Sequence, residues 1–414
     1  MNKSKIAFLI LVSALIYVMS YFHRVATSSI SLDLMDSFGI SASEMGILGG
    51  VTMAAYGIMQ MPSGMLTDLL GGRLVLLLLN LIAGFGAIWF ACSDSLTMAV
   101  AARFVTGIGL ATVIPVITVL SKNCPRRVFI LFTSLVMATA GIGHFISAPP
   151  MIYLSSAFGW RNAMMLFGFI TIALGILSWF MIPPEGKKDM SENDARKTNI
   201  RSFLPSIKAL FASRQYWIIC LWFLIVEGSC FCMDTLWWVP YIVQGHGLSM
   251  STAGYVSTVL AISLILGYPL QGWLSDGVFK ARRPVLVINN IVAIAVPCVL
   301  IFLPNLGFFT LMGAIALFGA FVHTTGPATY GIAADMCDSS VAGTAMGFVN
   351  MTYAVWAFIL QYLYGKAIVI TQEMGWTMQS SHNAGISLVL ICAIIGFVLL
   401  MLLKEPKKNQ TDDN

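Results

Sequence analysis

Long apolar runs, separated by short polar stretches, occupy nearly the whole chain. A helix of about 20 apolar residues crosses the hydrocarbon core of a bilayer. The sequence contains roughly twelve segments of this kind, centred near Ile16, Ala55, Ile82, Val113, Ala138, Thr171, Leu224, Leu260, Ala293, Leu317, Ala357 and Ile395. The pattern predicts an all-α membrane protein with twelve transmembrane helices.

The most polar internal stretch lies in the middle of the chain. It reads "PPEGKKDMSENDARKTNIRS" from Pro183 to Ser202, and an amphipathic piece, "FLPSIKALFASR", follows it. Such stretches are typical of linkers and of membrane surfaces. Six apolar segments lie on each side, so we expect an N-terminal bundle over 1–182, a cytoplasmic linker over 183–214, a C-terminal bundle over 215–404 and a cytoplasmic tail over 405–414.

The two halves repeat each other. "FGISASEMG" at 38–46 matches "HGLSMSTAG" at 246–254, and "GMLTD" at 64–68 matches "GWLSD" at 272–276. Both pairs of motifs are separated by the same 208 positions. One constant offset indicates duplicated six-helix bundles. Parallel repeats of this kind surround a central site near the bilayer midplane.

Composition narrows the classes of protein. Hydrophobic residues make up 58% of the 414 residues and charged residues 10%, which no water-soluble domain shows. No room is left for a globular catalytic domain, and no Ser/His/Asp, metal-ligand or paired-carboxylate arrangement has access to solvent. We therefore expect no enzyme, no cofactor and no metal. The first segment follows Lys3 and Lys5 but has no small-residue cleavage site, so we expect it to be retained.

Basic residues fall almost entirely on one side if the segments alternate across the membrane. These are Lys3, Lys5, Arg73, Lys122, Arg126, Arg127, Lys187, Lys188, Arg196, Lys197, Arg201, Lys208, Arg214, Lys280, Arg282, Arg283, Lys404, Lys407 and Lys408. Only Arg161 and Lys366 fall on the other side. The positive-inside rule then predicts a multi-pass protein of the cytoplasmic (inner) membrane with both termini in the cytoplasm. The net charge of +5 needs no nucleic-acid partner, and we expect a monomer in the lipid bilayer.

"GMLTDLLGGR" and its second copy, "GWLSDGVFKARR", resemble the signature of the major facilitator superfamily. The resemblance extends to the whole twelve-segment plan and implies a carrier that works by alternating access. It also implies that these turns latch the cytoplasmic face, through a conformational switch formed by Gly64, Asp68, Gly71, Arg73, Gly272, Asp276, Arg282 and Arg283. The family often has Arg directly after the first Asp, whereas this chain has Leu69.

Two further stretches compare with family motifs. "RFVTGIG", which begins at Arg103, resembles the fourth-helix motif and implies a structural or proton-linked role for that Arg, as part of the switch. "GIGHFISAPP", which ends at Pro150, lacks the Gly-Pro pair and terminal Gly pair of drug-exporting relatives. The absence of these two pairs weighs against a drug/proton antiporter.

Arg24 is the first of several ionisable residues inside predicted spans, where each charge costs at least about 2.5 kcal/mol. Such residues usually face a cavity, and the guanidinium offers a planar fork that matches carboxylate, sulfonate or phosphate groups. "YFHRVATSSI" also resembles the first helix of organic-anion and organophosphate carriers, which implies a substrate-binding Arg24. The repeat places Cys232 at the equivalent position, so the paired-Arg clamp of phosphate-ester exchangers is absent. A monoanion or zwitterion is therefore favoured.

Glu227 is the predicted proton-coupling carboxylate, and a helix-to-helix hydrogen bond is the alternative. Asp234 lies nearer the outer end, where solvated structural roles are common, and ranks below it. Secondary proton-coupling candidates are His23, His144 and His323. Candidates for contact with substrate, besides Arg24, are Tyr21, Trp237, Trp238 and Gln361.

These observations predict a secondary transporter of a small organic anion or zwitterion, of carboxylate or sulfonate type, coupled to protons as a symporter. An exporter or anion exchanger with the same fold is one alternative. A transporter-like sensor that binds its ligand without moving it is the other.

Overall fold

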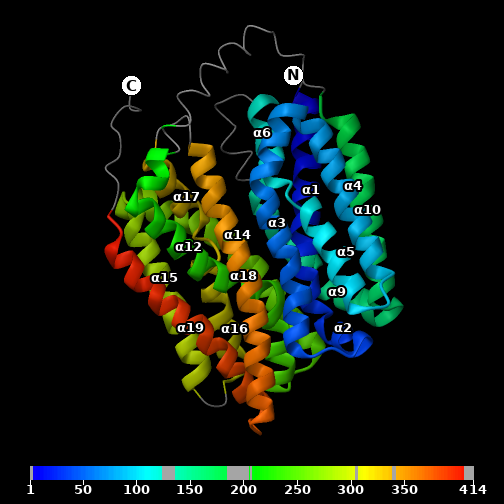
Figure 1. Ribbon diagram of the computed structural model, residues 1–414, viewed down its shortest axis with the longest axis vertical. Coiled ribbons are helices and arrows are strands. Elements are labelled where there is room, and N and C mark those ends of the chain that lie inside the picture. Colours follow the sequence, from blue (N-terminus) through cyan, green and yellow to red (C-terminus); the bar gives the residue numbers. More distant parts are fainter. Residues whose placement is uncertain are drawn as a thin grey trace.

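The computed structural model describes residues 3–123, 136–183, 205, 208–303, 306–337 and 342–404. Every regular element within these ranges is helical, as the apolar pattern predicts. The helices run along the long axis of the molecule, and both termini lie at the same end (Figure 1). We call the opposite end the far end.

The N-terminal half begins with a 27-residue helix, and its helices vary widely in length. They are α1 (Lys3–Ser29), α2 (Ser31–Phe38), α3 (Ala42–Leu70), α4 (Gly72–Ala91), α5 (Leu96–Gly109), α6 (Val113–Asn123), α8 (Ala140–Ile146), α9 (Pro149–Phe158) and α10 (Trp160–Met181).

The C-terminal half contains four π-helical turns, η1 to η4, inside or beside its α-helices. The elements are α12 (Arg214–Cys232), η1 (Met233–Trp237), α13 (Trp238–Pro240), η2 (Tyr241–Gly245), α14 (Met250–Gly272), η3 (Trp273–Phe279), α15 (Arg283–Phe302), α16 (Phe308–Leu317), η4 (Phe318–Val322), α17 (Gly326–Asp335), α18 (Ala342–Glu373) and α19 (Met378–Leu402).

The repeated Gly-x-Ser motif starts the second long helix of each half in the same way. Gly39 and Gly247 both have positive φ, 60° and 66°, which a residue without Cβ adopts at little cost. Two residues later, the Ser41 and Ser249 side chains accept hydrogen bonds from backbone N–H groups of the first helical turn, at 3.4 and 3.2 Å. These serines satisfy backbone donors that the helix leaves unpaired. The sequence repeat therefore encodes one local structure twice.

Ten helices in the described ranges are long and apolar enough to cross a membrane. The bent pair Ser31–Phe38 and Ala42–Gly64 makes an eleventh if it forms one span. The fifth predicted segment appears as the short helices α8 and α9, and residues 124–135 before it lie outside the described ranges. The count of twelve stays a prediction, as do the bundle boundaries, because most of the 183–214 linker and the 405–414 tail also lie outside these ranges.

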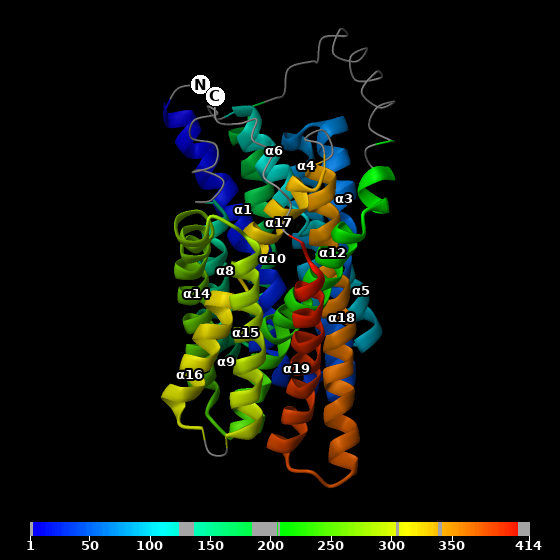
Figure 2. The same ribbon diagram turned by 90° about the vertical axis from the view of Figure 1, so that its left-hand side faces the viewer.

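The two halves meet most extensively where α3 packs along α18 (Figure 2). Glycines make this contact close. A Cβ added at Gly57 would lie 2.6 Å from the Ala354 Cβ, and one at Gly46 would lie 2.9 Å from the Tyr362 Cα. Further contacts between the halves join α8 to α14 and α1 to η1. The halves are therefore in direct backbone contact from the middle of the molecule to the far end.

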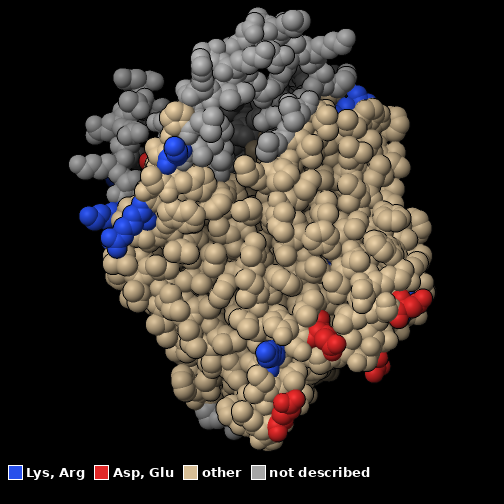
Figure 3. All heavy atoms as spheres, in the orientation of Figure 1, with Lys and Arg blue, Asp and Glu red and all other residues tan. Residues whose placement is uncertain are grey.

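Charged side chains are unevenly distributed on the face shown in Figure 3. Lysine and arginine side chains gather mainly toward the end with both termini, and acidic side chains toward the far end. The side of the membrane that each end faces stays a prediction.

Candidate functional site

Arg24 lies in the middle of the molecule, on α1, and is only 2% exposed. Its guanidinium lies over the ring of Tyr21, 4.3 Å from the centroid, and over Tyr56 of α3, at 4.8 Å. The Nε atom donates to the Ser20 carbonyl at 3.4 Å. The Nη2 atom is buried and has no hydrogen-bond partner among the described residues. Arg24 is thus enclosed by protein instead of facing lipid.

Tyrosines from both halves surround this guanidinium. Tyr17 of α1 and Tyr353 of α18 are close enough to interact electrostatically with Arg24, together with Tyr21 and Tyr56. Within the described part of the chain, no carboxylate lies within ion-pairing distance of Arg24. A buried cation without a counterion is costly. An anionic guest would remove that cost.

A second buried cluster lies next to Tyr21 and contains a carboxylate and two imidazoles. Asp234 of η1 accepts from His144 Nε2 of α8 at 2.6 Å and from the Tyr21 hydroxyl at 3.4 Å. His323, which follows η4, places Nε2 2.5 Å from the Tyr21 hydroxyl and 3.7 Å from the second Asp234 oxygen. The Cys230 Sγ atom is 3.3 Å from His323 Nδ1. We call Tyr21, His144, Asp234 and His323 the His–Asp cluster.

The expectation for Asp234 was wrong in one respect. It is 4% exposed, accepts hydrogen bonds from Tyr21 and His144 of the N-terminal half and lies 3.7 Å from His323 of its own half, whereas the sequence placed it toward a solvated outer end. Three histidines, His23, His144 and His323, accompany a single Asp inside the predicted spans, and this excess of titratable groups is the signal that could have pointed to the cluster.

Glu227, on α12, is also buried, at 3% exposure. The Thr325 hydroxyl donates to its Oε2 atom at 2.5 Å. Both residues belong to the C-terminal half, so this hydrogen bond holds one half together. Its role in proton coupling stays a prediction.

The predicted aromatic and amide contacts divide into two groups. Trp237 donates to the Gln361 carbonyl at 3.3 Å and stacks on Tyr364, with centroids 4.6 Å apart. The Gln361 amide donates to the Thr235 hydroxyl at 2.6 Å. Trp238 packs edge-on against Phe318 with centroids 5.7 Å apart, and its buried Nε1 atom has no partner in the described ranges. These groups join helices, and their contact with substrate stays a prediction.

His23 and Arg103 connect helices within the N-terminal half. His23 Nε2 lies 2.9 Å from the Thr171 hydroxyl of α10, and Arg103 of α5 donates to the His23 carbonyl at 3.1 Å. The structure thus places His23 and Arg103 apart from the His–Asp cluster, in a brace between α1, α5 and α10.

The turn between α3 and α4 carries the first copy of the predicted switch, and the structure describes only some of its residues. Gly71, between α3 and α4, has a φ of 84°, which favours glycine. A Cβ at Gly64 would lie 3.2 Å from Ile114, and Arg73 lies over the Trp179 ring at 4.1 Å. The Asp68 side chain lies outside the described residues.

In the second copy of the turn, the Asp276 side chain also lies outside the described residues, and a Cβ at Gly272 would meet open space. Arg282 forms an ion pair with Asp335 of α17, and Arg283 donates to the Leu400 carbonyl at 3.3 Å. The sequence analysis missed Asp335 because nothing in the motif points to a partner so distant along the chain.

Replacing Asp335 by asparagine is expected to lower thermal stability only slightly. The side chains of Arg282 and Asp335 are 28% and 30% exposed, so water and salt screen their attraction. Pairs of this kind contribute about 0.2–1 kcal/mol. Thermal melting of the purified Asp335→Asn protein measures the effect, and the single variant Arg282→Gln and the double variant Arg282→Gln/Asp335→Asn complete the cycle. A coupling energy several times larger would contradict a simple surface ion pair.

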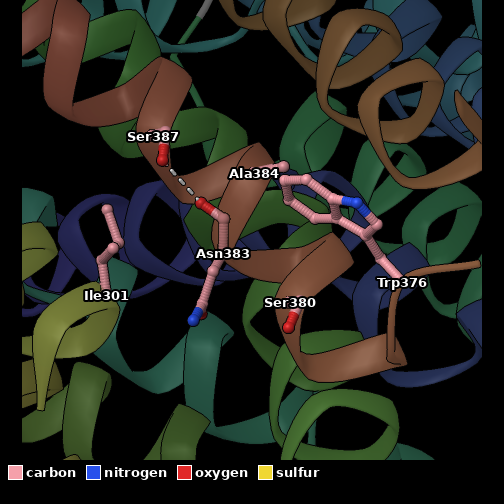
Figure 4. A pocket seen from close by; sticks show the side chains of 6 residues that line it. All are labelled: Ile301, Trp376, Ser380, Asn383, Ala384 and Ser387. Atoms are coloured by element: carbon pink, nitrogen blue, oxygen red, sulfur yellow. Dashed lines mark hydrogen bonds between the residues drawn. The ribbon is translucent and has the colours of Figure 1, made fainter. Parts of the chain in front are cut away.

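An open cavity of about 410 Å³ lies elsewhere, between the last turns of α15 and the start of α19 (Figure 4). Its lining consists of Ile301, Trp376, Ser380, Asn383, Ala384 and Ser387. Ser387 donates to the Asn383 carbonyl at 2.8 Å. This lining contains no charged side chain and none of the predicted site residues, so the candidate site is the region around Arg24.

Three named bacterial transporters are similar to this chain in sequence. The uncharacterized transporter YybO of Bacillus subtilis is 24% identical over 93% of this chain and 89% of its own length. The gallate transporter of Pseudomonas putida is 25% identical over 70% of this chain and 68% of its own. The probable sulfoacetate transporter SauU of Cupriavidus necator is 22% identical over 86% of both chains.

Solved structures show the same fold. A bacterial homologue of the human lysosomal transporter Spinster, in an inward-facing and occupied conformation, gives a TM-score of 0.75 at 17% identity over 98% of both chains. A D-xylose-proton symporter gives 0.74 at 13% identity over 98% of this chain and 99% of its own. The sequence profile described as Major Facilitator Superfamily matches residues 10–361 and 234–413, so this chain belongs to that superfamily.

Proposed function

We propose that this protein moves a small organic monoanion or zwitterion, with a carboxylate or sulfonate group, across the cytoplasmic membrane together with protons. Both termini face the cytoplasm in this proposal, and the far end faces the outside. The observation that supports it most directly is a buried Arg24 without a counterion in the described part of the chain.

The surroundings of Arg24 suit an acid group better than a neutral solute. Tyr21 and Tyr56 lie over the guanidinium, so an acid approaches it along the edge, where Nη2 is unpaired. An edge-on approach permits two parallel N–H···O bonds to a carboxylate or sulfonate. The names of two relatives, a gallate and a sulfoacetate transporter, agree with an acidic solute.

Alternating access is part of this proposal because the tyrosines around Arg24 come from both halves. Tyr17 and Tyr21 come from the N-terminal half, and Tyr353 comes from the C-terminal half. A rotation of one half against the other therefore opens or closes the surroundings of Arg24. The solute drives that rotation only as far as it binds the two conformations with different affinity.

A binding screen with matched solutes tests the acid requirement. We expect gallate or sulfoacetate to raise the melting temperature of the purified protein in a panel of carboxylates and sulfonates, because a ligand of the folded state stabilises it. Methyl gallate keeps the ring and hydroxyl groups but has no carboxylate, so it should have no such effect. Equal stabilisation by the ester, or none by any acid in the panel, would contradict the proposal.

Uptake into proteoliposomes then separates a carrier from a sensor. An acid that stabilises the protein should accumulate inside the vesicles, and faster when the outside is more acidic. Binding without accumulation would favour the sensor, and accumulation driven only by a counter-anion would favour the exchanger.

A further inference from the structure

We propose that the His–Asp cluster is the proton site of this carrier and that it links proton binding directly to the contact between the two halves. This inference rests on the proposed function and identifies where its proton binds. The cluster takes Tyr21 and His144 from the N-terminal half, and Asp234 and His323 from the C-terminal half.

When both histidines are neutral, one assignment of donors and acceptors satisfies all the hydrogen bonds of the cluster. The Tyr21 hydroxyl donates to Asp234 and therefore accepts from His323 Nε2–H. Cys230 S–H donates to His323 Nδ1. His144 Nε2–H donates to the other Asp234 oxygen. These tautomers are assigned from the network.

One atom of this network remains available for a further proton. His144 Nδ1 is buried and has no hydrogen-bond partner in the part of the chain that the structure describes. A proton on that atom converts the 2.6 Å contact between His144 and Asp234 into an ion pair across the two halves. Protonation therefore strengthens a contact that exists only while the halves are together.

The cluster is joined to the proposed anion site through one side chain. The Tyr21 ring lies 4.3 Å from the Arg24 guanidinium, and its hydroxyl bonds to Asp234. The described side chains of Arg24 and Asp234 form no ion pair, so each charge is neutralised separately: a bound monoanion neutralises Arg24, and a proton on His144 neutralises Asp234. The negative charge of the bound anion also attracts the proton. The anion and the proton thus favour each other's binding, and the coupling is reciprocal.

Glu227 is less suited to this role because its hydrogen bond to Thr325 stays within one half. It belongs, with Cys230, to the groups of α12 that act electrostatically on the cluster. The other ionisable neighbours are Arg24 and Tyr17 of α1 and Tyr268 of α14. Glu227, Cys230 and Tyr268 belong to the same half as Asp234, whereas Arg24 and Tyr17 belong to the other half, as His144 does. Of these last three, His144 is the one that is hydrogen-bonded to Asp234, so their contact is the feature that changes most directly when the halves separate.

The test measures the separation of the halves and needs no solute. Nitroxide labels on p-acetylphenylalanine at Asp36 and Met374, both exposed at the far end, report it by pulsed electron spin resonance and leave the native cysteines in place. Lowering the pH from about 8 to about 5.5, an interval in which histidine side chains generally change charge, should shift the labels toward the shorter distance. We expect the ratio of the two populations to change at least about fivefold, the lower range for coupled sites.

Asp234→Asn and His144→Gln should each remove this pH response. His382→Gln is the matched control, because His382 is equally buried but its ring neighbours in the described residues, such as Tyr364 and Gln244, belong to its own half. This variant should respond as the unmodified protein does. If Asp234→Asn does not fold, His144→Gln alone decides.

The proposal is overturned if the unmodified protein shows no pH response, or if a folded Asp234→Asn or His144→Gln protein retains it. Loss of the response in Glu227→Gln alone would assign the proton to Glu227 and also overturn the proposal. Failure of the acid screen leaves these distances unaffected, so the two proposals fail separately.

Discussion

Arg24→Ala is expected to abolish uptake of the acid that the screen identifies. The substitution removes both N–H groups that would bind the acid edge-on. Hydrogen bonds to charged groups contribute about 1.5–3 kcal/mol each, and the loss of two corresponds to at least about a hundredfold in Kd. Titration of the purified variant measures binding, and proteoliposome uptake measures transport.

Arg24→Lys separates the contribution of charge from that of shape. Lysine keeps the positive charge but loses the planar fork that holds both acid oxygens at once. We expect weaker binding and strongly reduced uptake, intermediate between Arg24→Ala and the unmodified protein. Full activity of Arg24→Lys would show that a point charge is sufficient.

Lys366→Ala is the matched control for these variants. Lys366 is an exposed cation of α18 near the far end, so its loss removes the same charge without touching the site. Its uptake should be unchanged, and all three variants should insert and melt as the unmodified protein does. Normal uptake by Arg24→Ala would remove the anion site from the proposal.

Much of the fold was predictable because bilayers impose simple rules on sequences. A spanning helix must satisfy its backbone internally and cover it with apolar side chains, so the spans appear as apolar runs. The repeat was readable because Ser41 and Ser249 perform the same N-capping task in both halves. Neither inference requires knowledge of how helices are rotated about their axes.

The His–Asp cluster was not predictable for the opposite reason. It depends on the rotation of four helices, and two of them are irregular at the critical point. Asp234 lies inside the π-helical turn η1, and His323 directly follows η4. A π-helical turn inserts an extra residue per turn and shifts every later side chain around the helix. An α-helical wheel therefore places these two side chains on the wrong faces. Arg24 lies in α1, which is α-helical throughout Lys3–Ser29, so its burial could be predicted from the sequence.

Gly46→Ala is expected to hinder closure of the far end. The added Cβ would lie 2.8 Å from the Gln361 carbonyl carbon and 2.9 Å from the Tyr362 Cα, both backbone atoms of α18 that cannot turn aside. Overpacking of this kind costs about 1–3 kcal/mol. Since the clash exists only while α3 and α18 are in contact, that free energy shifts the population toward the conformation with the far end open, by at least about fivefold.

Uptake should fall by a similar factor in Gly46→Ala, because each transport cycle must pass through the closed conformation. Binding of the acid from the outside should persist, since Arg24 is untouched. Gly347→Ala, on the partner helix α18 but with open space around the added Cβ, is the matched control and should transport normally. The spin-label distances used for the His–Asp cluster test the mechanism directly: Gly46→Ala should retain a long distance even at low pH. A normal distance distribution together with reduced uptake would place the defect in folding or insertion instead of closure.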